Sequence, residues 1–149
     1  MGLKERLEAD LTKAVRERNE LSRSTLRLLR SEIHNEEIAL QRPVDEEGII
    51  GVIAKQVRQH RESIDAFRKG RREDLVQREE AELRLLLEYL PAQLTREEVG
   101  ALAQQVIQDV GASGPAHRGR VMGKLMPQVR GKAEGAMVNE VVSQLLEKL

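Results

Sequence analysis

Hydrophobic residues recur at helical spacing along almost the whole chain, at steps of three and four residues. In the N-terminal part this pattern predicts four amphipathic helices, over residues 3–18, 21–40, 45–69 and 72–89. Farther along it predicts three more, over residues 95–109, 116–126 and 136–148, with residues 127–135 as a loop or distorted turn. We therefore expect an all-α protein.

Residues that begin or end helices divide the pattern. Pro43 should end the second helix, because the residue before a proline is disfavoured in the helical conformation. Asp45 is a suitable N-cap for the third helix. Residues 90–94, which include Pro91, are the best linker candidate, and Thr95 and Glu98 after them have the spacing of a capping box. We therefore expect an N-terminal helical domain of about four helices over residues 1–94 and a small three-helix domain over residues 95–149.

Composition narrows the class of protein. The chain has 149 residues, 40% of them hydrophobic and 1% aromatic, and its formal net charge is zero, which argues against a generally basic nucleic-acid binder. There is no cysteine, which excludes disulfides and thiolate metal sites. No apolar run approaches the roughly 18 residues of a membrane span, and the first residues lack the apolar core of a signal peptide. We expect a cytoplasmic location and no membrane partner.

The most unusual stretch lies between Gly114 and Asn139. Up to Lys132 it contains no aspartate or glutamate, and its cations are Arg118, Arg120, Lys124, Arg130 and Lys132. Gly119 and Gly123 lie four residues apart within an apolar helical pattern. Each glycine inside a helix costs roughly 0.5–1 kcal/mol relative to alanine. A smooth helix surface is therefore expected to serve a closely packed neighbour or the backbone of a partner.

Two interpretations of this stretch follow from the residues. In the first, glycines and cations contact a phosphate backbone, helped by free N–H groups at the start of the helix near residue 116. The stretch has no aromatic residue, so we expect recognition of RNA shape rather than base stacking. In the second, Gly119 and Gly123 pack tightly against another helix beneath a solvated basic face. Asn139 could likewise meet RNA or form a hydrogen bond to the preceding loop.

Here the sequence resembles a known family. The run GRVMGKLMPQVRGKAEGAMVNEVV resembles the C-terminal tail domain of the GatB/YqeY family, which ends the GatB component of the aspartyl/glutamyl-tRNA amidotransferase. The segments LRLLRSEIHNEEI, KQVRQHRESIDAFRKGRREDL and EEAELRLLLEYLPAQL are similar to the YqeY family. The resemblance covers nearly the whole chain and implies contact with tRNA. The positions matching the motif of the tail are Gly119, Gly123, Lys124, Lys132 and Asn139.

The expected function is binding to tRNA or to a tRNA-handling complex, without catalysis by this chain. The expected RNA-binding residues are Arg118, Gly119, Arg120, Gly123, Lys124, Arg130, Lys132 and Asn139. The resemblance leaves a first alternative, a carbon–nitrogen ligase that uses glutamine as amido-N-donor as part of a tRNA-dependent amidotransferase. A second alternative is a helical adaptor that binds proteins and no RNA.

The sequence indicates no catalytic residues, no metal site and no cofactor. The three histidines, His34, His60 and His117, have no metal-ligand spacing, and His60 is expected to be a half-buried core residue. Adjacent glutamates such as Glu79 and Glu80 point to different sides of a helix and do not form an acid–base pair. A second basic run fits a solvated helix face or, alternatively, a second RNA contact: Arg58, Arg61, Arg68, Lys69, Arg71 and Arg72.

Overall fold

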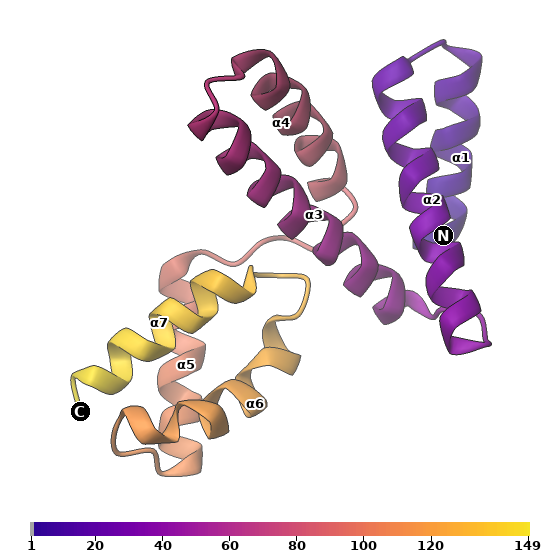
Figure 1. Cartoon of the computed structure of the whole chain (residues 1–149). Helices are drawn as coiled ribbons and strands as arrows, with labels where there is room; N and C mark the ends of the chain where they lie inside the picture. The colour runs from indigo at the N-terminus through magenta and orange to yellow at the C-terminus, as the bar shows by residue number, and fades with distance from the viewer. Residues whose placement is uncertain (1) are drawn as a thin grey trace. The chain divides into compact units, whose positions relative to one another are not determined.

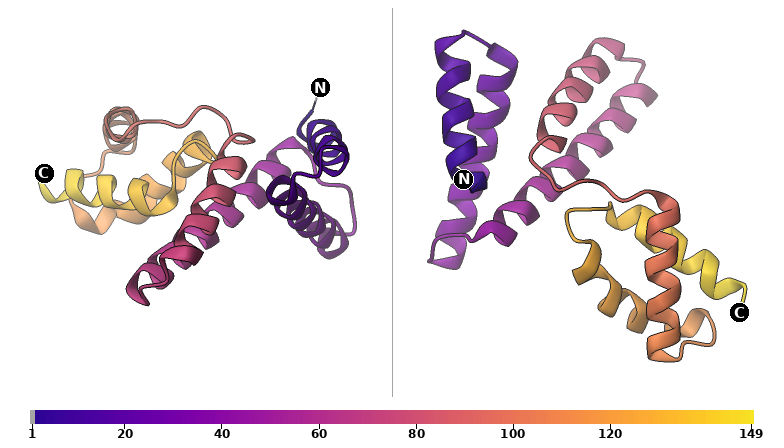
Figure 2. Two further views of the ribbon diagram at one scale, coloured as in Figure 1. Left: turned by 90° about the horizontal axis from the view of Figure 1, so that it is seen from above. Right: turned by 180° about the vertical axis from the view of Figure 1, so that it is seen from behind.

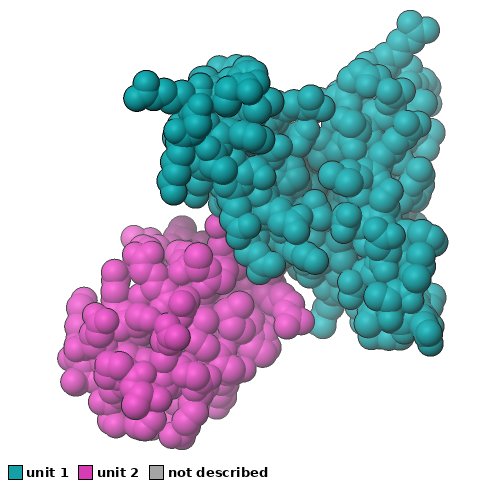
Figure 3. Space-filling model, viewed as in Figure 1, with its two compact units in different colours: residues 1–90 teal, residues 91–149 magenta. Residues whose placement is uncertain are grey.

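The computed structural model describes residues 2–149, and this part of the chain contains seven α-helices, one 3-10 helix and no strand (Figure 1). The all-α class expected from the sequence is confirmed. The chain divides into two compact units, one ending at Leu90 and the other running from Pro91 to Leu149 (Figure 3). Among the described helices, none combines the length and the hydropathy that crossing a membrane requires.

The N-terminal unit consists of α1 (Leu3–Arg16), α2 (Glu20–Leu40), α3 (Glu46–Lys69) and α4 (Glu73–Leu87). Helix α1 lies beside α2 and α3 lies beside α4, and α2 also contacts both α3 and α4 (Figures 1 and 2). The apolar stripes of the helices meet in a shared core, as the helical spacing requires. Its most buried side chains include Leu7, Leu11, Leu26, Leu29, Ile33, Ile53, Val57, Val76 and Leu86.

Short polar side chains fix where these helices begin and end. The carboxylate of Asp45 accepts a hydrogen bond from the Gly48 N–H at 2.8 Å, which confirms the predicted N-cap of α3. Helix α2 ends at Leu40, and the left-handed backbone of its C-cap, Gln41 (φ 56°), turns the chain before Pro43. Helix α3 ends at Lys69, the last residue of the predicted third helix, and Gly70 is its C-cap.

Glu37 joins three parts of the N-terminal unit. Its Oε2 accepts a hydrogen bond from the Val44 N–H at 3.0 Å and another from Lys4 Nζ at 3.2 Å. The Val44 N–H and the Lys4 ammonium both favour the charged carboxylate and hold the pKa of Glu37 below its ordinary value. One side chain therefore links α1, the last turns of α2 and the connection to α3.

Tyr89 performs a similar role beyond α4. The predicted fourth helix runs through Tyr89, but α4 ends at Leu87 and Tyr89 lies in the turn that follows. Its ring is buried, its hydroxyl donates a hydrogen bond to Asp10 of α1, and the guanidinium carbon of Arg6 lies 4.4 Å from the ring centroid. Burial and the bond to Asp10 raise the pKa of Tyr89. The end of the unit is thereby tied to its first helix.

The C-terminal unit consists of α5 (Arg96–Val110), the 3-10 helix η1 (Pro115–His117), α6 (Arg118–Val129) and α7 (Gly135–Glu147). The α-helices surround a second core, made of Val99, Ala103, Val106, Val121, Leu125, Val129, Val138, Val142 and Leu146. At the start of α5, Thr95 Oγ1 accepts from the Glu98 N–H and Glu98 Oε1 accepts from the Thr95 N–H, both at 3.1 Å. The predicted capping box is confirmed.

The predicted loop over residues 127–135 is wrong in its first part. Helix α6 continues through Pro127 and ends at Val129. Pro127 removes a helical hydrogen bond to the carbonyl of Gly123. Val129 is nevertheless fully buried and extends the stripe of Val121 and Leu125 by one more turn. Burial of this side chain, worth about 1.5–3 kcal/mol, offsets the cost of the proline.

Candidate functional site

Helix α6 presents one apolar face to the core and one open face outward. Val121, Leu125 and Val129 are buried, at intervals of four residues. Gly119, Gly123 and Pro127 follow the same interval two residues out of phase, and all three are exposed. We call these three residues the glycine face. The register of the buried stripe alone therefore turns the glycines away from the core.

Neither glycine of this face packs against the protein. A Cβ atom added at Gly119 or at Gly123 would meet no heavy atom within 4 Å. The interpretation of the glycines as a tight helix-packing surface is therefore wrong for this chain. Their exposed positions leave the helix backbone accessible to another molecule, at a cost of roughly 0.5–1 kcal/mol of helix stability for each glycine.

The two arginines in the first turn of α6 are held by neutral oxygen atoms. Arg118 Nη1 donates to Asn139 Oδ1 at 3.1 Å, so Asn139 of α7 pairs with α6 and not with the preceding loop as one interpretation expects. Arg120 Nη2 donates to the backbone carbonyl of Val110, the last residue of α5, at 2.9 Å. Since neither partner is a carboxylate, both guanidinium charges remain uncompensated by these contacts.

The remaining expected cations lie on α6 and on the loop after it. Lys124, Arg130 and Lys132 are exposed, and within residues 2–149 no ion pair involves them. The loop backbone is well held: Gln93 Nε2 donates to the Gly131 carbonyl at 2.8 Å and the Leu94 N–H to the Lys132 carbonyl at 2.7 Å. Among the expected RNA-binding residues, the structure thus shows one side-chain hydrogen bond, between Arg118 and Asn139, and no other side-chain contact that joins them.

The start of this helical segment carries no competing negative charge. Neither η1 nor α6 has an acidic residue in its first turn, and no side chain caps either start. His117 Nδ1 instead accepts a hydrogen bond from the Ser113 N–H at 2.9 Å, which places the ring beside the entry to α6. A helix start of this kind favours an anion.

Two arginines of the second basic run are paired with carboxylates. Arg68 Nη2 lies 2.8 Å from Glu80 Oε1, and Arg72 Nη2 lies 3.1 Å from Asp74 Oδ2. Both pairs are exposed and hold their charges in place, as on a solvated helix face. The run therefore offers less uncompensated charge than the C-terminal stretch.

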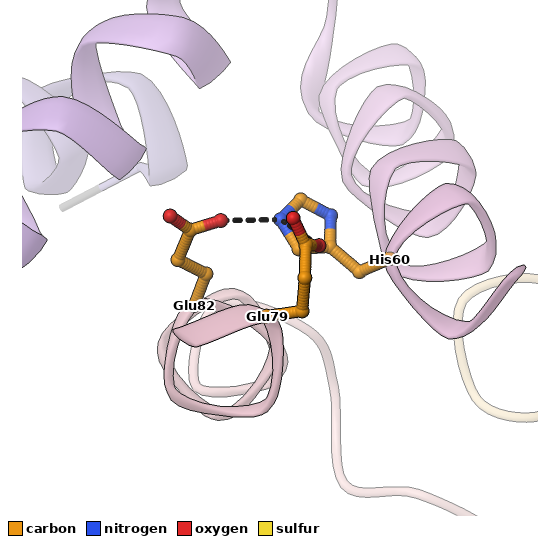
Figure 4. A group of neighbouring side chains, drawn as sticks. All are labelled: His60, Glu79 and Glu82. Carbon is orange, nitrogen blue, oxygen red and sulfur yellow. Dashed lines mark hydrogen bonds and ion pairs between the residues drawn. The ribbon is translucent and has the colours of Figure 1, made fainter. Parts of the chain in front are cut away.

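Sequence reasoning missed one polar cluster in the N-terminal unit. His60 of α3 and Glu79 and Glu82 of α4 point toward one another across the hairpin (Figure 4). His60 Nε2 lies 3.0 Å from Glu82 Oε2 and 3.7 Å from Glu79 Oε2. His60 is 8% exposed, more buried than expected. Partial burial raises the pKa of Glu79; the charge on Glu82 adds to this effect and His60 opposes it.

Comparison with known proteins places the chain in a family. The sequence profile of the family described as Yqey-like protein matches residues 4–146. The chain belongs to the YqeY-like family. The resemblance stated from the sequence is therefore confirmed for this family over nearly the full length of the chain.

The YqeY-like chain is similar to fungal proteins named "Altered inheritance of mitochondria protein 41, mitochondrial". The protein of Pyrenophora tritici-repentis is 30% identical over 147 residues, covering 97% of this chain and 78% of its own length. That of Kluyveromyces lactis is 34% identical over 152 residues, covering 96% of this chain and 81% of its own. That of Saccharomyces cerevisiae strain YJM789 is 33% identical over 85 residues, or 56% of this chain and 46% of its own.

These names contradict the cytoplasmic location that the sequence analysis expects. That expectation rested on the absence of an apolar leader or span. Transit peptides for mitochondria are amphipathic and rich in arginine and serine, with no apolar core. The absence of an apolar segment therefore does not distinguish a cytoplasmic protein from a mitochondrial one, and the expectation of a cytoplasmic location is wrong.

Proposed function

We propose that the C-terminal unit of this YqeY-like protein binds RNA, with tRNA as the first candidate, through α6 and the loop after it. The single observation that carries the proposal is the glycine face. Its two glycines are exposed, fill no packing role, and lie on the same helix as Arg118, Arg120 and Lys124. An open helix backbone beside uncompensated cations suits the close approach of a sugar-phosphate chain.

The residue types define the expected mode of binding. Arg118 and Arg120 are held by an amide oxygen and a carbonyl, so their charges are available to phosphates. Residues 91–149 contain no phenylalanine, tyrosine or tryptophan, so stacking of unpaired bases on aromatic rings has no support here. We therefore expect phosphate contacts and recognition of RNA shape, with weak dependence on sequence. The resemblance to the amidotransferase tail is what favours tRNA as the probe.

The test is a titration of the purified chain against total tRNA at several salt concentrations. We expect saturable binding whose log association constant falls linearly with log salt, by about 0.7–0.9 for each phosphate contacted. Changing Arg118, Arg120, Lys124 and Lys132 together to glutamate should abolish binding. A milder variant, K124E/K132E, changes only residues without ion pairs among the described residues and should weaken binding without affecting the fold.

The matched control reverses the same number of exposed charges elsewhere. Lys13, Arg16, Arg27 and Lys55 lie exposed on α1, α2 and α3, outside both basic stretches, and their change to glutamate gives the same net charge. The proposal requires this control to keep most of the tRNA affinity while the C-terminal variant loses it. If both variants lose the same tRNA affinity, the loss reflects the net charge of the protein and not a specific site. If the folded wild-type chain does not bind tRNA at low salt, the RNA-binding proposal is wrong and the protein-adaptor alternative is left.

A further inference from the structure

The hydrogen bond at Nδ1 of His60 fixes a proton on that ring nitrogen. Its Nδ1 lies 2.8 Å from the backbone carbonyl of Gln56, one turn earlier in α3. A carbonyl oxygen only accepts, so Nδ1 carries the proton and donates it. In the neutral ring the unprotonated Nε2 then points its lone pair at Glu82 Oε2, 3.0 Å away. The Nε2 lone pair and the Glu82 carboxylate are both acceptors, and at this distance they repel each other unless a proton or a metal ion lies between them.

The same geometry is the one that proteins use to prepare a histidine for a metal ion. A ligand histidine usually donates its other ring N–H to a carbonyl or carboxylate, which fixes the tautomer and the orientation of the ring. The Gln56 carbonyl does this for His60. Arg78 Nε contacts Glu82 Oε1 at 3.4 Å and leaves Oε2 facing the imidazole. Both sides of the cluster are therefore oriented by neighbouring groups.

The spacing of the donor atoms fits a small divalent ion. One atom from each of His60, Glu79 and Glu82 lies within 4.8 Å of the others. Bonds of about 2.0–2.2 Å in tetrahedral geometry place ligand atoms roughly 3.3–3.5 Å apart. The distances from His60 Nε2, 3.0 and 3.7 Å, lie on either side of that value. The spacing of these donor atoms is therefore compatible with a shared ion.

A pocket beside the cluster contains a second, independent polar feature. This pocket of about 170 Å³ is lined by His60, Glu82, Gln56 and Thr25, among others. Thr25 is 6% exposed, and its hydroxyl is buried without a hydrogen-bond partner among the described residues. A ligand in the pocket would supply the partner that this buried hydroxyl lacks. The remaining coordination positions of a bound ion would therefore face a pocket with a polar lining.

We propose that His60, Glu79 and Glu82 bind a divalent transition-metal ion, with Zn²⁺ as the representative, and that the remaining coordination faces the pocket lined by Thr25. One imidazole and two carboxylates form a mixed nitrogen and oxygen donor set that suits Zn²⁺, Mn²⁺ or Fe²⁺. The two carboxylates supply the charge that balances the ion. The ion would join α3 to α4 inside the N-terminal unit.

The test measures Zn²⁺ binding by calorimetry and Co²⁺ binding by visible absorption, with the full chain free of any polyhistidine tag. The wild-type chain should bind one ion, and bound Co²⁺ should show the intense visible bands of a four- or five-coordinate site. Glu79→Gln and Glu82→Gln keep side-chain volume and should each weaken binding by about 10-fold or more. Zn²⁺ at about 100 times Kd should raise Tm by roughly 10 °C, reversed by a chelator.

The matched controls lie next to the proposed ligands. Glu80→Gln changes a carboxylate on the same helix that pairs with Arg68 instead, and His34→Gln removes an exposed histidine on α2. Both should bind Zn²⁺ like the wild type. Glu79→Gln and Glu82→Gln binding as tightly as Glu80→Gln would overturn the proposal, as would a folded wild type without saturable binding. In the latter case a proton alone lies between His60 and Glu82.

Discussion

Tyr89 shows at the scale of one residue how a polar atom fixes an apolar side chain. The sequence pattern places it only as the last residue of the predicted helix over residues 72–89. In the structure its hydroxyl donates to Asp10, 79 residues earlier, and Arg6 covers its ring. Apolar packing is non-directional, so packing alone would restrict the orientation of the ring less than the hydrogen bond does. The hydrogen bond and the cation determine that the turn after α4 meets α1.

Tyr89→Phe should therefore lower the free energy of unfolding by about 1–2 kcal/mol, because the bond to a charged acceptor is lost while the ring remains. Urea denaturation near pH 7 measures the difference. The raised pKa of Tyr89 means that its contribution is present below the ordinary tyrosine value of 10.0 and is lost as the pH rises from there toward the folded-state value. The difference between the two proteins should hence shrink above pH 10. A difference independent of pH would contradict this account of the hydroxyl.

At the scale of elements, α5 and α6 contrast. Helix α5 begins with a complete capping box and faces the core with regular aliphatic side chains. Helix α6 has no side-chain cap, two exposed glycines and an internal proline. Its stability comes from Val121, Leu125 and Val129, which are fully buried. Helix α6 is thus held by tertiary packing rather than by its own propensity.

The double change G119A/G123A should separate stability from binding. Alanine at these exposed helical positions should raise the free energy of unfolding by about 1–2 kcal/mol, since the added methyl groups meet nothing. If RNA approaches the glycine face, the same variant should bind tRNA more weakly. Chemical denaturation and the tRNA titration give the two values.

Gly100→Ala is the matched control for this pair. Gly100 lies inside α5, where an added Cβ also meets no atom within 4 Å. It should stabilise the chain by about half as much and leave tRNA binding unchanged. Unaltered tRNA affinity in G119A/G123A would exclude close approach at the glycine face.

The scale of elements also shows where sequence reasoning succeeds. Helical spacing, the Asp45 cap and the Thr95–Glu98 capping box are local signals, and the structure confirms them. The path of α6 through Pro127 was missed because the burial of Val129 depends on α5 and α7. The cluster at His60 was missed because its ligands lie 19 and 22 residues apart from it. Pairing α3 with α4 about the turn near Arg71 would have brought residue 60 opposite residue 82.

At the scale of the whole molecule, the two units differ in size and in the contacts that hold their end segments in place. The N-terminal unit has Tyr89 and Asp10 joining its end to its beginning. The C-terminal unit, from Pro91 to Leu149, is small for an independent core. Its first residues compensate by bonding to the loop between α6 and α7. Residues 91–94 are therefore expected to contribute to the stability of this unit.

A pair of fragments tests this contribution. A fragment of residues 91–149 should be helical by circular dichroism and unfold cooperatively. A fragment of residues 95–149 lacks Gln93 and Leu94, with two hydrogen bonds to the loop and the packing of Leu94 on the core. It should be less stable by about 2–4 kcal/mol. Equal stability of the two fragments would place the domain boundary at residue 95, as the sequence alone suggests.

The attachment of the linker to the basic loop has a mechanical consequence. The chain leaving Leu90 reaches Gln93 and Leu94 first, and these bond to the carbonyls of Gly131 and Lys132. The loop that carries Arg130 and Lys132 is therefore held to residues 93–94, directly before the N-cap of α5. A ligand that binds those two cations would hold in place the loop to which Gln93 and Leu94 are bonded, and would so strengthen the attachment of these first residues within the C-terminal unit.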